Sequence, residues 1–406
     1  MSVQVVEIFT EIDGSEVTVG RYYPHRNGGT LEYAQEWLNH PNSYALSPAV
    51  PLSRGKQPLI GERGHLPTVL SDSAPDRWGR MLIQKELASK GQRPAEIDYL
   101  LGVADSFRLG ALRMRVEGVV QSQTSRVPKV LELDQLERAA RAVERGDEGI
   151  EALARVAQAG SSLGGARPKA TVVDEEGRLH MAKFSSASDT IELVAWEKVC
   201  LDIAAASGVN VPTSQLMRIN SRPVLLLERF DRSYDQHGYE TRIPYMSAMT
   251  LLNLTDGQQA SMVEIAEAIQ PLAGDVQETL SELFLRTAVN LFIGNTDNHL
   301  RNHGFVRVDN EWRPSPAFDL TPATSKTDFA TPIDLGAPDN VDTLIEAADW
   351  FELDQGRAVE LLAGVVEAVS VWRDLARKHG IPTSDDRLIA TGFDSEHLER
   401  AREILA

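Results

Sequence analysis

The pattern of hydrophobic and polar positions divides the chain into three regions. Short strand-like runs mixed with a helical period over 77–89 predict a small α/β domain at residues 1–120. A Gly-rich segment and two strand pairs follow within residues 121–233, and the pattern over 234–406 is almost wholly helical. Strands and helices that are segregated in this way predict an α+β fold.

The second and third regions carry the clearest local signals. The loop Asp-Glu-Glu-Gly at 174–177 ends on the residue that a hairpin loop tolerates best. Gly208, with Pro212 just beyond it, is a helix stop. The expected strands are 169–173, 178–184, 215–219 and 223–228. The expected helices are 191–207, 261–269, 276–293, 343–353, 357–379 and 395–405.

Composition places the chain among acidic globular proteins. Its 406 residues include 41 Lys+Arg and 59 Asp+Glu, for a formal net charge of −18. The single cysteine, Cys200, excludes an intrachain disulfide and a zinc cluster, which suits a reducing cytosol. The sequence has no secretory signal pattern and no run near the ~18 apolar residues of a membrane span. We therefore expect a cytoplasmic protein without membrane contact, and since its charge repels phosphate backbones, any DNA contact is expected to be indirect.

Lys183 and Glu197 are charged residues at positions that the pattern buries. On its strand Lys183 shares a face with Leu179 and Met181. In its helix Glu197 lies on the apolar stripe, where an unpaired carboxylate is costly to bury. A strand lysine held by a glutamate of the next helix is the arrangement with which protein kinases grip the ATP phosphates. The alternatives are a lysine that reaches water at the strand end, and two unrelated surface charges.

The segment at 290–305 continues a long apolar helix that Gly294 ends. Asp297 and Asn302 stand five positions apart, which is the spacing of a kinase catalytic loop, where the aspartate orients the substrate hydroxyl and the asparagine holds magnesium. Asp319 follows 17 residues after Asn302, where a second magnesium-binding aspartate is expected. Each residue alone is also typical of a turn or a helix N-cap, but together the features stand in kinase order.

A metal-dependent hydrolase is a different interpretation of the same segment. Asp297, His299, His303 and Asp319 would then hold a divalent ion, and the two histidines stand i, i+4 apart. Gly304 and the Asn-rich surroundings argue against the helix that would put both histidines on one face.

The glycines of the segment GSSLGGARPK stand just before the first strand of the second region. Backbone amides in such a loop can wrap phosphates. The segment matches neither the Walker pattern nor the Gly-x-Gly-x-x-Gly of ordinary protein kinases, so a plain flexible loop is the alternative.

Together these motifs resemble the HipA toxins, bacterial serine/threonine protein kinases of type II toxin–antitoxin modules, over nearly the whole chain. SSLGGARPKA resembles the family's phosphate loop, LLLERFDR its hinge, GNTDNHLRN its catalytic loop and AFDLTP its metal motif. LSDSAPDRWGRMLI and LLGVADSFRLGALRM resemble its N-terminal domain. The resemblance implies a HipA-like protein kinase fold. In it, the small N-terminal α/β domain packs on a bilobal kinase core with an N-lobe at 121–233 and a mostly helical C-lobe at 234–406.

The resemblance also implies residue roles and cofactors. Asp297 is the implied catalytic base, Asn302 and Asp319 are the implied Mg²⁺ ligands, and Glu197 is the implied partner of Lys183. The residues implied to contact ATP are Gly164, Gly165, Ala166, Arg167, Pro168, Lys169, Lys183, Glu228, Arg229, Phe230, His299 and Asn302. The pair Arg167-Pro168 departs from the Gln-Glu of some members, and Arg301 stands where a lysine is common.

Ser162 matches the serine that the family autophosphorylates, with Ser161 as an adjacent competitor. In the family this modification expels the phosphate loop and switches the kinase off. A phosphoserine adds about −1.5 to −2 charge, which repels the phosphates of ATP. A serine that serves only as a hydrogen-bonding group of the loop is the alternative.

The implied function is that of a toxin kinase that transfers the γ-phosphate of ATP to a serine or threonine of a cellular protein, such as an aminoacyl-tRNA synthetase. The implied partner is a small HipB-like antitoxin, which binds operator DNA and brings the toxin with it. The alternative is a catalytically silent pseudokinase that acts as a co-repressor or scaffold. The presence of Asp297, Asn302 and Asp319 together with Lys183 and Glu197 argues against that alternative.

Overall fold

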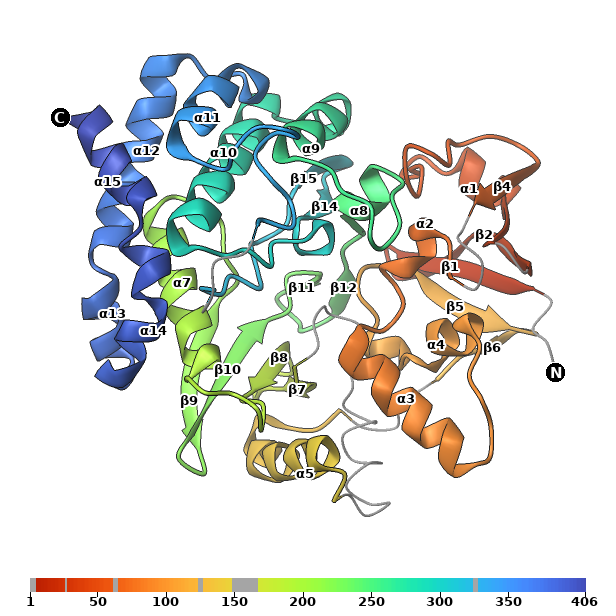
Figure 1. The fold of residues 1–406 in the computed structure, drawn as a ribbon. Coiled ribbons are helices and arrows are strands. Elements are labelled where there is room, and N and C mark those ends of the chain that lie inside the picture. Colours follow the sequence, from red (N-terminus) through yellow and green to blue (C-terminus); the bar gives the residue numbers. More distant parts are fainter. Residues whose placement is uncertain (1–4, 26–27, 61–64, 123–126, 148–166, 324–327) are drawn as a thin grey trace. The chain divides into compact units, whose positions relative to one another are not determined.

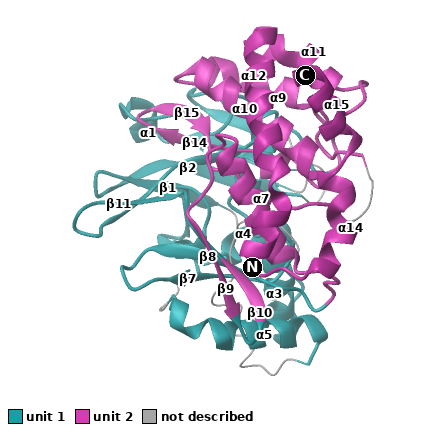
Figure 2. Ribbon diagram, turned by 90° about the vertical axis from the view of Figure 1, so that its left-hand side faces the viewer, with its two compact units in different colours: residues 1–187, 219–221, 226–256 teal, residues 188–218, 222–225, 257–406 magenta. Residues whose placement is uncertain are grey.

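The computed structural model describes residues 5–25, 28–60, 65–122, 127–147, 167–323 and 328–406 (Figure 1). The chain forms two compact units, which Figure 2 distinguishes by colour. Unit 1 comprises residues 1–187, 219–221 and 226–256, and unit 2 comprises residues 188–218, 222–225 and 257–406. The mixture of segregated strands and helices confirms the α+β class. Both predicted domain boundaries fall inside unit 1, and the three-part division stays a prediction.

The N-terminal part of unit 1 is built on a six-stranded antiparallel sheet in the order β4-β3-β2-β1-β5-β6. Its strands are β1 (Val6–Ile12), β2 (Ser15–His25), β3 (Gly28–Tyr33), β4 (Lys56–Ile60), β5 (Arg113–Val116) and β6 (Val119–Val120). Its helices are α1 (Gln35–Asn39), α2 (Thr68–Ser71), α3 (Arg77–Ser89) and α4 (Glu96–Gly102). The core side chains Ile8, Val19 and Leu31 come from three neighbouring strands and are fully buried. Helix α3 has the predicted bounds, because Asp76 caps its first turn through Gly79 N at 2.7 Å.

A second sheet has the strand order β7-β8-β10-β9. Its strands are β7 (Lys169–Val173), β8 (Leu179–Phe184), β9 (Ser214–Ile219) and β10 (Arg222–Glu228). The hairpin of β7 and β8 runs in register from Lys169 opposite Lys183 to Val173 opposite Leu179. The remaining elements of unit 1 are α5 (Leu133–Arg145), β11 (Arg232–Tyr234), β12 (Glu240–Arg242), β13 (Tyr245–Ser247) and α8 (Ala248–Leu251).

Unit 2 is mostly helical, as the pattern predicts for the C-terminal region. Its helices are α7 (Leu193–Ala206), α9 (Met262–Ile269), α10 (Val276–Ile293), α11 (Val341–Glu346), α12 (Gln355–Ser370), α13 (Trp372–Lys378), α14 (Thr383–Phe393) and α15 (Glu396–Leu405). A hairpin of β14 (Gly304–Val308) and β15 (Glu311–Pro314) interrupts them. Helix α10 packs against α12, and α12 packs against α7 (Figure 1).

The predicted helix 357–379 is wrong as a single element, because the chain turns at Val371 between α12 and α13. The turn brings Trp372 into a ring cluster with Trp196 of α7 and Phe393 of α14, at centroid distances of 5.8 Å and 4.9 Å. Burial of a large aromatic side chain such as Trp372 is favourable enough to stabilise a turn in place of a straight helix. The cluster holds α7 in place at Trp196, and Glu197 is the residue that directly follows Trp196.

Within the described ranges, no helix has both the length and the apolar character that crossing a bilayer requires.

Candidate active site

The predicted catalytic loop begins where α10 ends. Gly294 caps the helix with a left-handed φ of 64°, and a Cβ at this position would lie 2.9 Å from Cα of Gly392. The backbone oxygen of Gly294 also accepts a hydrogen bond from Ala323 N at 3.0 Å. Glycine is required here because any side chain would meet a neighbouring backbone. The start of the loop is therefore held firmly on the end of a buried helix.

Asp297 and Asn302 come together at the far end of this loop. The side chain of Asp297 is exposed, and its backbone oxygen accepts a hydrogen bond from Asn302 Nδ2 at 3.1 Å. Asn302 N donates to the backbone oxygen of His299 at 2.8 Å. With the amide nitrogen engaged, Asn302 Oδ1 is buried without a hydrogen-bond partner. An unpaired buried oxygen is costly unless a ligand satisfies it, which fits a cation at this position.

Asp319 adjoins the same loop through its backbone. Asn295 Nδ2 lies 3.4 Å from the backbone oxygen of Asp319 and 2.7 Å from Oδ1 of Asn290. Asp319 has a φ of 55°, in the left-handed region that residues with a side chain rarely occupy. Such backbone conformations concentrate at functional sites, where the surrounding structure enforces them. Pattern reasoning missed Asn290 and Asn295, although an asparagine inside an apolar helix was an available signal.

The donor set of Asn302 and Asp319 fits magnesium. Both offer hard oxygen atoms, and Mg²⁺ typically takes one or two carboxylate or amide oxygens from the protein and completes its shell with water and substrate phosphates. In the part of the chain that the structure describes, no group of three or more His, Cys, Asp or Glu side chains could hold a metal ion.

The histidines do not support the hydrolase interpretation. The segment around them is a 3-10 turn at Leu300–Asn302 followed by extended backbone, so His299 and His303 do not share a helix face. His303 is buried and its Nε2 donates to the backbone oxygen of Asn298 at 3.1 Å. Burial, assisted by the charge of Arg286, lowers the pKa of His303 to about 4. His303 is a structural residue of the loop, and the three-residue metal cluster that a hydrolase needs is absent among the described residues.

Lys183 and Glu197 are both buried, as the sequence predicts. Lys183 is 8% exposed on β8 in unit 1, and Glu197 is 4% exposed on α7 in unit 2. Charged side chains are buried at this level only when they are paired or bind a ligand. Their mutual pairing stays a prediction.

The start of β7 holds the last residue of the predicted phosphate loop. Lys169 is 2% exposed, and its Nζ lies 2.7 Å from Oδ2 of Asp76. The side chain is thus engaged in a buried ion pair, and its predicted contact with ATP stays a prediction. Pro168 is buried, and its backbone oxygen accepts a hydrogen bond from Phe184 N at 2.9 Å. The residues Ser161, Ser162, Gly164, Gly165 and Ala166 lie outside the described residues.

The predicted hinge follows β10. Arg229 N donates to the backbone oxygen of Leu179 on β8 at 3.0 Å. Glu228 is the last residue of β10, and Phe230 lies in the turn that follows. The Arg229 side chain is 2% exposed and donates from Nε to Oδ1 of Asp231 at 2.7 Å. Arg229 therefore anchors the hinge, which is compatible with adenine contacts from the backbone of its two neighbours.

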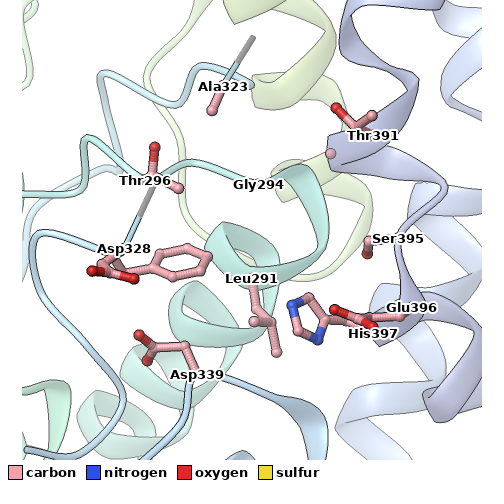
Figure 3. A pocket seen from close by; sticks show the side chains of 12 residues that line it. Leu291, Gly294, Thr296, Ala323, Asp328, Asp339, Thr391, Ser395, Glu396 and His397 are labelled. Carbon is pink, nitrogen blue, oxygen red and sulfur yellow. The ribbon is translucent and has the colours of Figure 1, made fainter. Parts of the chain in front are cut away.

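A cavity of about 320 Å³ lies beside the first residues of the catalytic loop (Figure 3). Gly294 and Thr296 line it, with Asp328 and Asp339 on one side and His397 on the other. Burial raises the pKa of Asp339, and the charge of Asp328 adds to this effect. None of the predicted site residues lines the cavity. The sequence did not predict the cavity, because its lining comes from segments about a hundred positions apart.

Comparisons with known proteins show the family and the fold. A model for the HipA-like C-terminal domain matches residues 161–372, and a model for the HipA N-terminal domain matches residues 11–114. A protein of Sinorhizobium fredii (strain NBRC 101917 / NGR234) with the name "Putative kinase Y4mE" is 24% identical over 357 residues, which cover 81% of this chain and 80% of that protein. A solved complex of Shewanella oneidensis MR-1 HipA, HipB and operator DNA matches with a TM-score of 0.70 at 16% identity. The match covers 98% of this chain and 97% of the solved chain, which shows the same fold.

Proposed function

The chain belongs to the HipA family, and from this premise we propose that it is a protein kinase that transfers the γ-phosphate of Mg-ATP to a serine or threonine of another protein. The observation that carries the proposal is the arrangement of Asp297, Asn302 and Asp319 in unit 2. An exposed carboxylate, a buried unpaired amide oxygen and an aspartate in left-handed backbone meet around one loop. This combination suits phosphoryl transfer, in which the protein mainly positions the reactants and stabilises charge.

Each of the three residues has a separate task in the proposed reaction. Asp297 orients the substrate hydroxyl and receives its proton as the oxygen–phosphorus bond forms and ADP leaves. Asn302 and Asp319 would hold the magnesium ion, which neutralises charge on the phosphates when it is bound. The hydrogen bond from Asn302 to the backbone of Asp297 keeps the base and the metal ligand in one geometry.

Further residues are proposed to contact the nucleotide. Lys183 binds the ATP phosphates and Glu197 holds Lys183, which is supported by the burial of both charges. The backbone of Glu228 and Phe230 contacts adenine, which is supported by the anchoring of Arg229 between them. His299 lies near the nucleotide, where its buried and unpartnered Nδ1 is available for a hydrogen bond. The phosphate loop from Gly164 to Lys169 covers the phosphates.

Regulation and partners form a second part of the proposal. Phosphorylation of Ser162, with Ser161 as the competing residue, ejects the phosphate loop and switches the kinase off. A HipB-like antitoxin neutralises the chain, which is supported by the solved complex of HipA with HipB and operator DNA that has the same fold. A net charge of −18 supports DNA contact mainly through such a partner. A protein such as an aminoacyl-tRNA synthetase is the proposed substrate.

Intact mass spectrometry after incubation with Mg-ATP tests this function. We expect one added phosphate that maps to peptides over residues 155–170, and no added phosphate when EDTA removes magnesium. Asp297→Asn abolishes the modification because it removes the proton acceptor. Asp309→Asn is the matched control, since Asp309 is an exposed carboxylate of the same unit in the turn of the β14–β15 hairpin.

Two results would contradict parts of this proposal. Labelling that persists in Asp297→Asn excludes Asp297 as the essential base. No labelling of the wild-type chain, although ATP binds, favours the pseudokinase that acts as a co-repressor or scaffold.

A further inference from the structure

We propose that Asp76 and Trp78 of the N-terminal region are positioning residues of the ATP phosphate site, through the contacts that they make with Lys169 at the start of β7. The inference rests on the proposed function and extends it. The motif that contains both residues, Leu-Ser-Asp-Ser-Ala-Pro-Asp-Arg-Trp-Gly-Arg at 70–80, has no role in the chemistry described above.

One carboxylate ties together a helix and a strand that are far apart in the sequence. Asp76 Oδ1 accepts the hydrogen bond of Gly79 N at 2.7 Å and so caps helix α3. Asp76 Oδ2 lies 2.7 Å from Nζ of Lys169. The two side chains are 4% and 2% exposed. Because both oxygens have partners in the interior, Asp76 links the first residue of β7 to the start of α3.

Trp78 holds the same residue by its backbone. Trp78 Nε1 donates to the backbone oxygen of Lys169 at 3.1 Å, and the indole is 2% exposed. Lys169 is thus held at its ammonium group by Asp76 and at its carbonyl by Trp78. Two independent contacts from one helix turn hold the last residue of the proposed phosphate loop.

The register of β7 and β8 connects this anchor to the phosphate-binding lysine. Lys169 stands directly opposite Lys183 in the antiparallel pair, so both side chains project from the same face of the sheet. Opposed residues have Cβ atoms about 4.5–5.5 Å apart, and like charges at that separation repel each other. Asp76 neutralises the ammonium group of Lys169 and so reduces this repulsion. The charge of Lys183 is then the one directed at the phosphates.

The backbone continues the same anchor toward the nucleotide. Phe184 N, directly after Lys183, donates to the backbone oxygen of Pro168 at 2.9 Å. The last residues of the phosphate loop and the phosphate-binding lysine therefore move as one rigid piece, whose position Asp76 and Trp78 set.

Asp76→Asn is the sharpest test, because asparagine caps a helix as well as aspartate does, while the negative charge toward Lys169 is lost. Isothermal titration with Mg-ATP and with adenosine compares the phosphate end with the base end of the site. We expect affinity for Mg-ATP to fall about tenfold or more, as misplaced reacting groups typically cost this much. Affinity for adenosine stays at the wild-type value, and the KM for ATP in self-phosphorylation rises more than kcat falls.

Two further variants keep the test decisive. Trp78→Phe retains an aromatic ring in the core, although a smaller one, and removes the hydrogen bond to Lys169, so it carries the test if Asp76→Asn does not fold. Glu96→Gln is the matched control. It breaks the ion pair, at 2.9 Å, between Glu96 of α4 and Arg80 of α3, the helix that Asp76 caps, and this pair does not involve β7. We expect the control to bind ATP as the wild type does.

The outcomes separate the inference from the proposed function. Wild-type affinity for ATP in both Asp76→Asn and Trp78→Phe overturns the inference and leaves the kinase intact. A proportional loss of ATP and adenosine affinity also overturns it, because this indicates general destabilisation. A wild-type chain that binds no Mg-ATP overturns the proposed function, and the inference with it.

Discussion

At the scale of the residue, unit 1 contains a buried carboxylate that pairs with two buried guanidinium groups. Asp231 is fully buried, and its carboxylate accepts from both Arg229 and Arg232. It also accepts from Gly110 N at 2.8 Å. Burial alone would raise the pKa of Asp231, but the charges of Arg229 and Arg232 outweigh it and hold that pKa well below its ordinary value. Removing the carboxylate would take from both buried guanidinium groups the counter-charge that they share, while Arg232 would keep its ion pair with Glu240.

Asp231→Asn is expected to destabilise the protein by about 3–5 kcal/mol at pH 7, the usual cost of breaking a buried ion pair. A carboxyl group whose folded pKa is depressed contributes stability above its unfolded pKa of about 3.9, and this contribution is lost as pH falls through the folded pKa. The difference between wild type and variant therefore shrinks below about pH 4. Urea unfolding at pH 7 and at pH 3.5 measures it, with Asp309→Asn as the exposed control. A difference that does not change with pH would contradict this account.

At the scale of the element, local caps decide where helices begin and end. Helix α10 has the bounds that the sequence predicts, because Asp275 caps its start through Glu278 N at 2.8 Å and Gly294 ends it. The break at Val371 was not predicted, since no Gly or Pro marks it and the packing of Trp372 produces it. The end of a helix is predictable from the sequence where neighbouring residues form its cap.

Two glycine substitutions test this interpretation with opposite signs. Gly294→Ala is expected to destabilise the protein, because left-handed backbone costs about 1–2 kcal/mol for a residue with a Cβ. That Cβ would also lie 2.9 Å from Gly392 Cα. Gly364→Ala is expected to stabilise it by about 1 kcal/mol, since alanine is the better helix former. Gly364 lies inside α12, and a Cβ there meets nothing within 4 Å. Thermal unfolding measures both, and equal shifts of Tm would refute the argument.

At the scale of the whole molecule, the N-terminal region supplies partners for buried charges of the predicted kinase core. Arg229 Nη1 donates to the backbone oxygen of Phe107 at 2.8 Å. Arg232 Nη2 donates to the backbone oxygen of Arg108 at 2.9 Å. These contacts, together with Asp76 on Lys169, lie within one compact unit. We therefore expect that the parts on either side of the predicted division at residue 120 are not independently stable.

A fragment of residues 127–406 is accordingly expected to lose cooperative folding. It keeps Lys169 but lacks Asp76, the counter-charge of that buried lysine. Arg229 and Arg232 keep Asp231 but lose the carbonyl oxygens of Phe107 and Arg108. Removing one partner of a buried ion pair typically costs about 3–5 kcal/mol. Circular dichroism during heating compares the fragment with the full chain under the same conditions. A fragment with a sharp unfolding transition would show that the core is autonomous.

The sequence by itself determined the order of the motifs, the class of each region and the bounds of elements such as α3, β7 and α10. These properties depend on periodicity and on caps, which lie within one or two turns of the chain. The burial of Lys183 and Glu197 followed for the same reason, since their faces could be read from their apolar neighbours.

Only the tertiary structure decided which partner each buried group has. Lys169 meets Asp76 across 93 positions, and Arg229 meets Phe107 across 122. The oxygen of Asn302 is left unpaired because its own amide nitrogen turns back to Asp297, and the backbone of Asp319 is held in a left-handed conformation. Such pairings arise when distant segments close on each other, and their free energy depends on burial and geometry that no local pattern encodes.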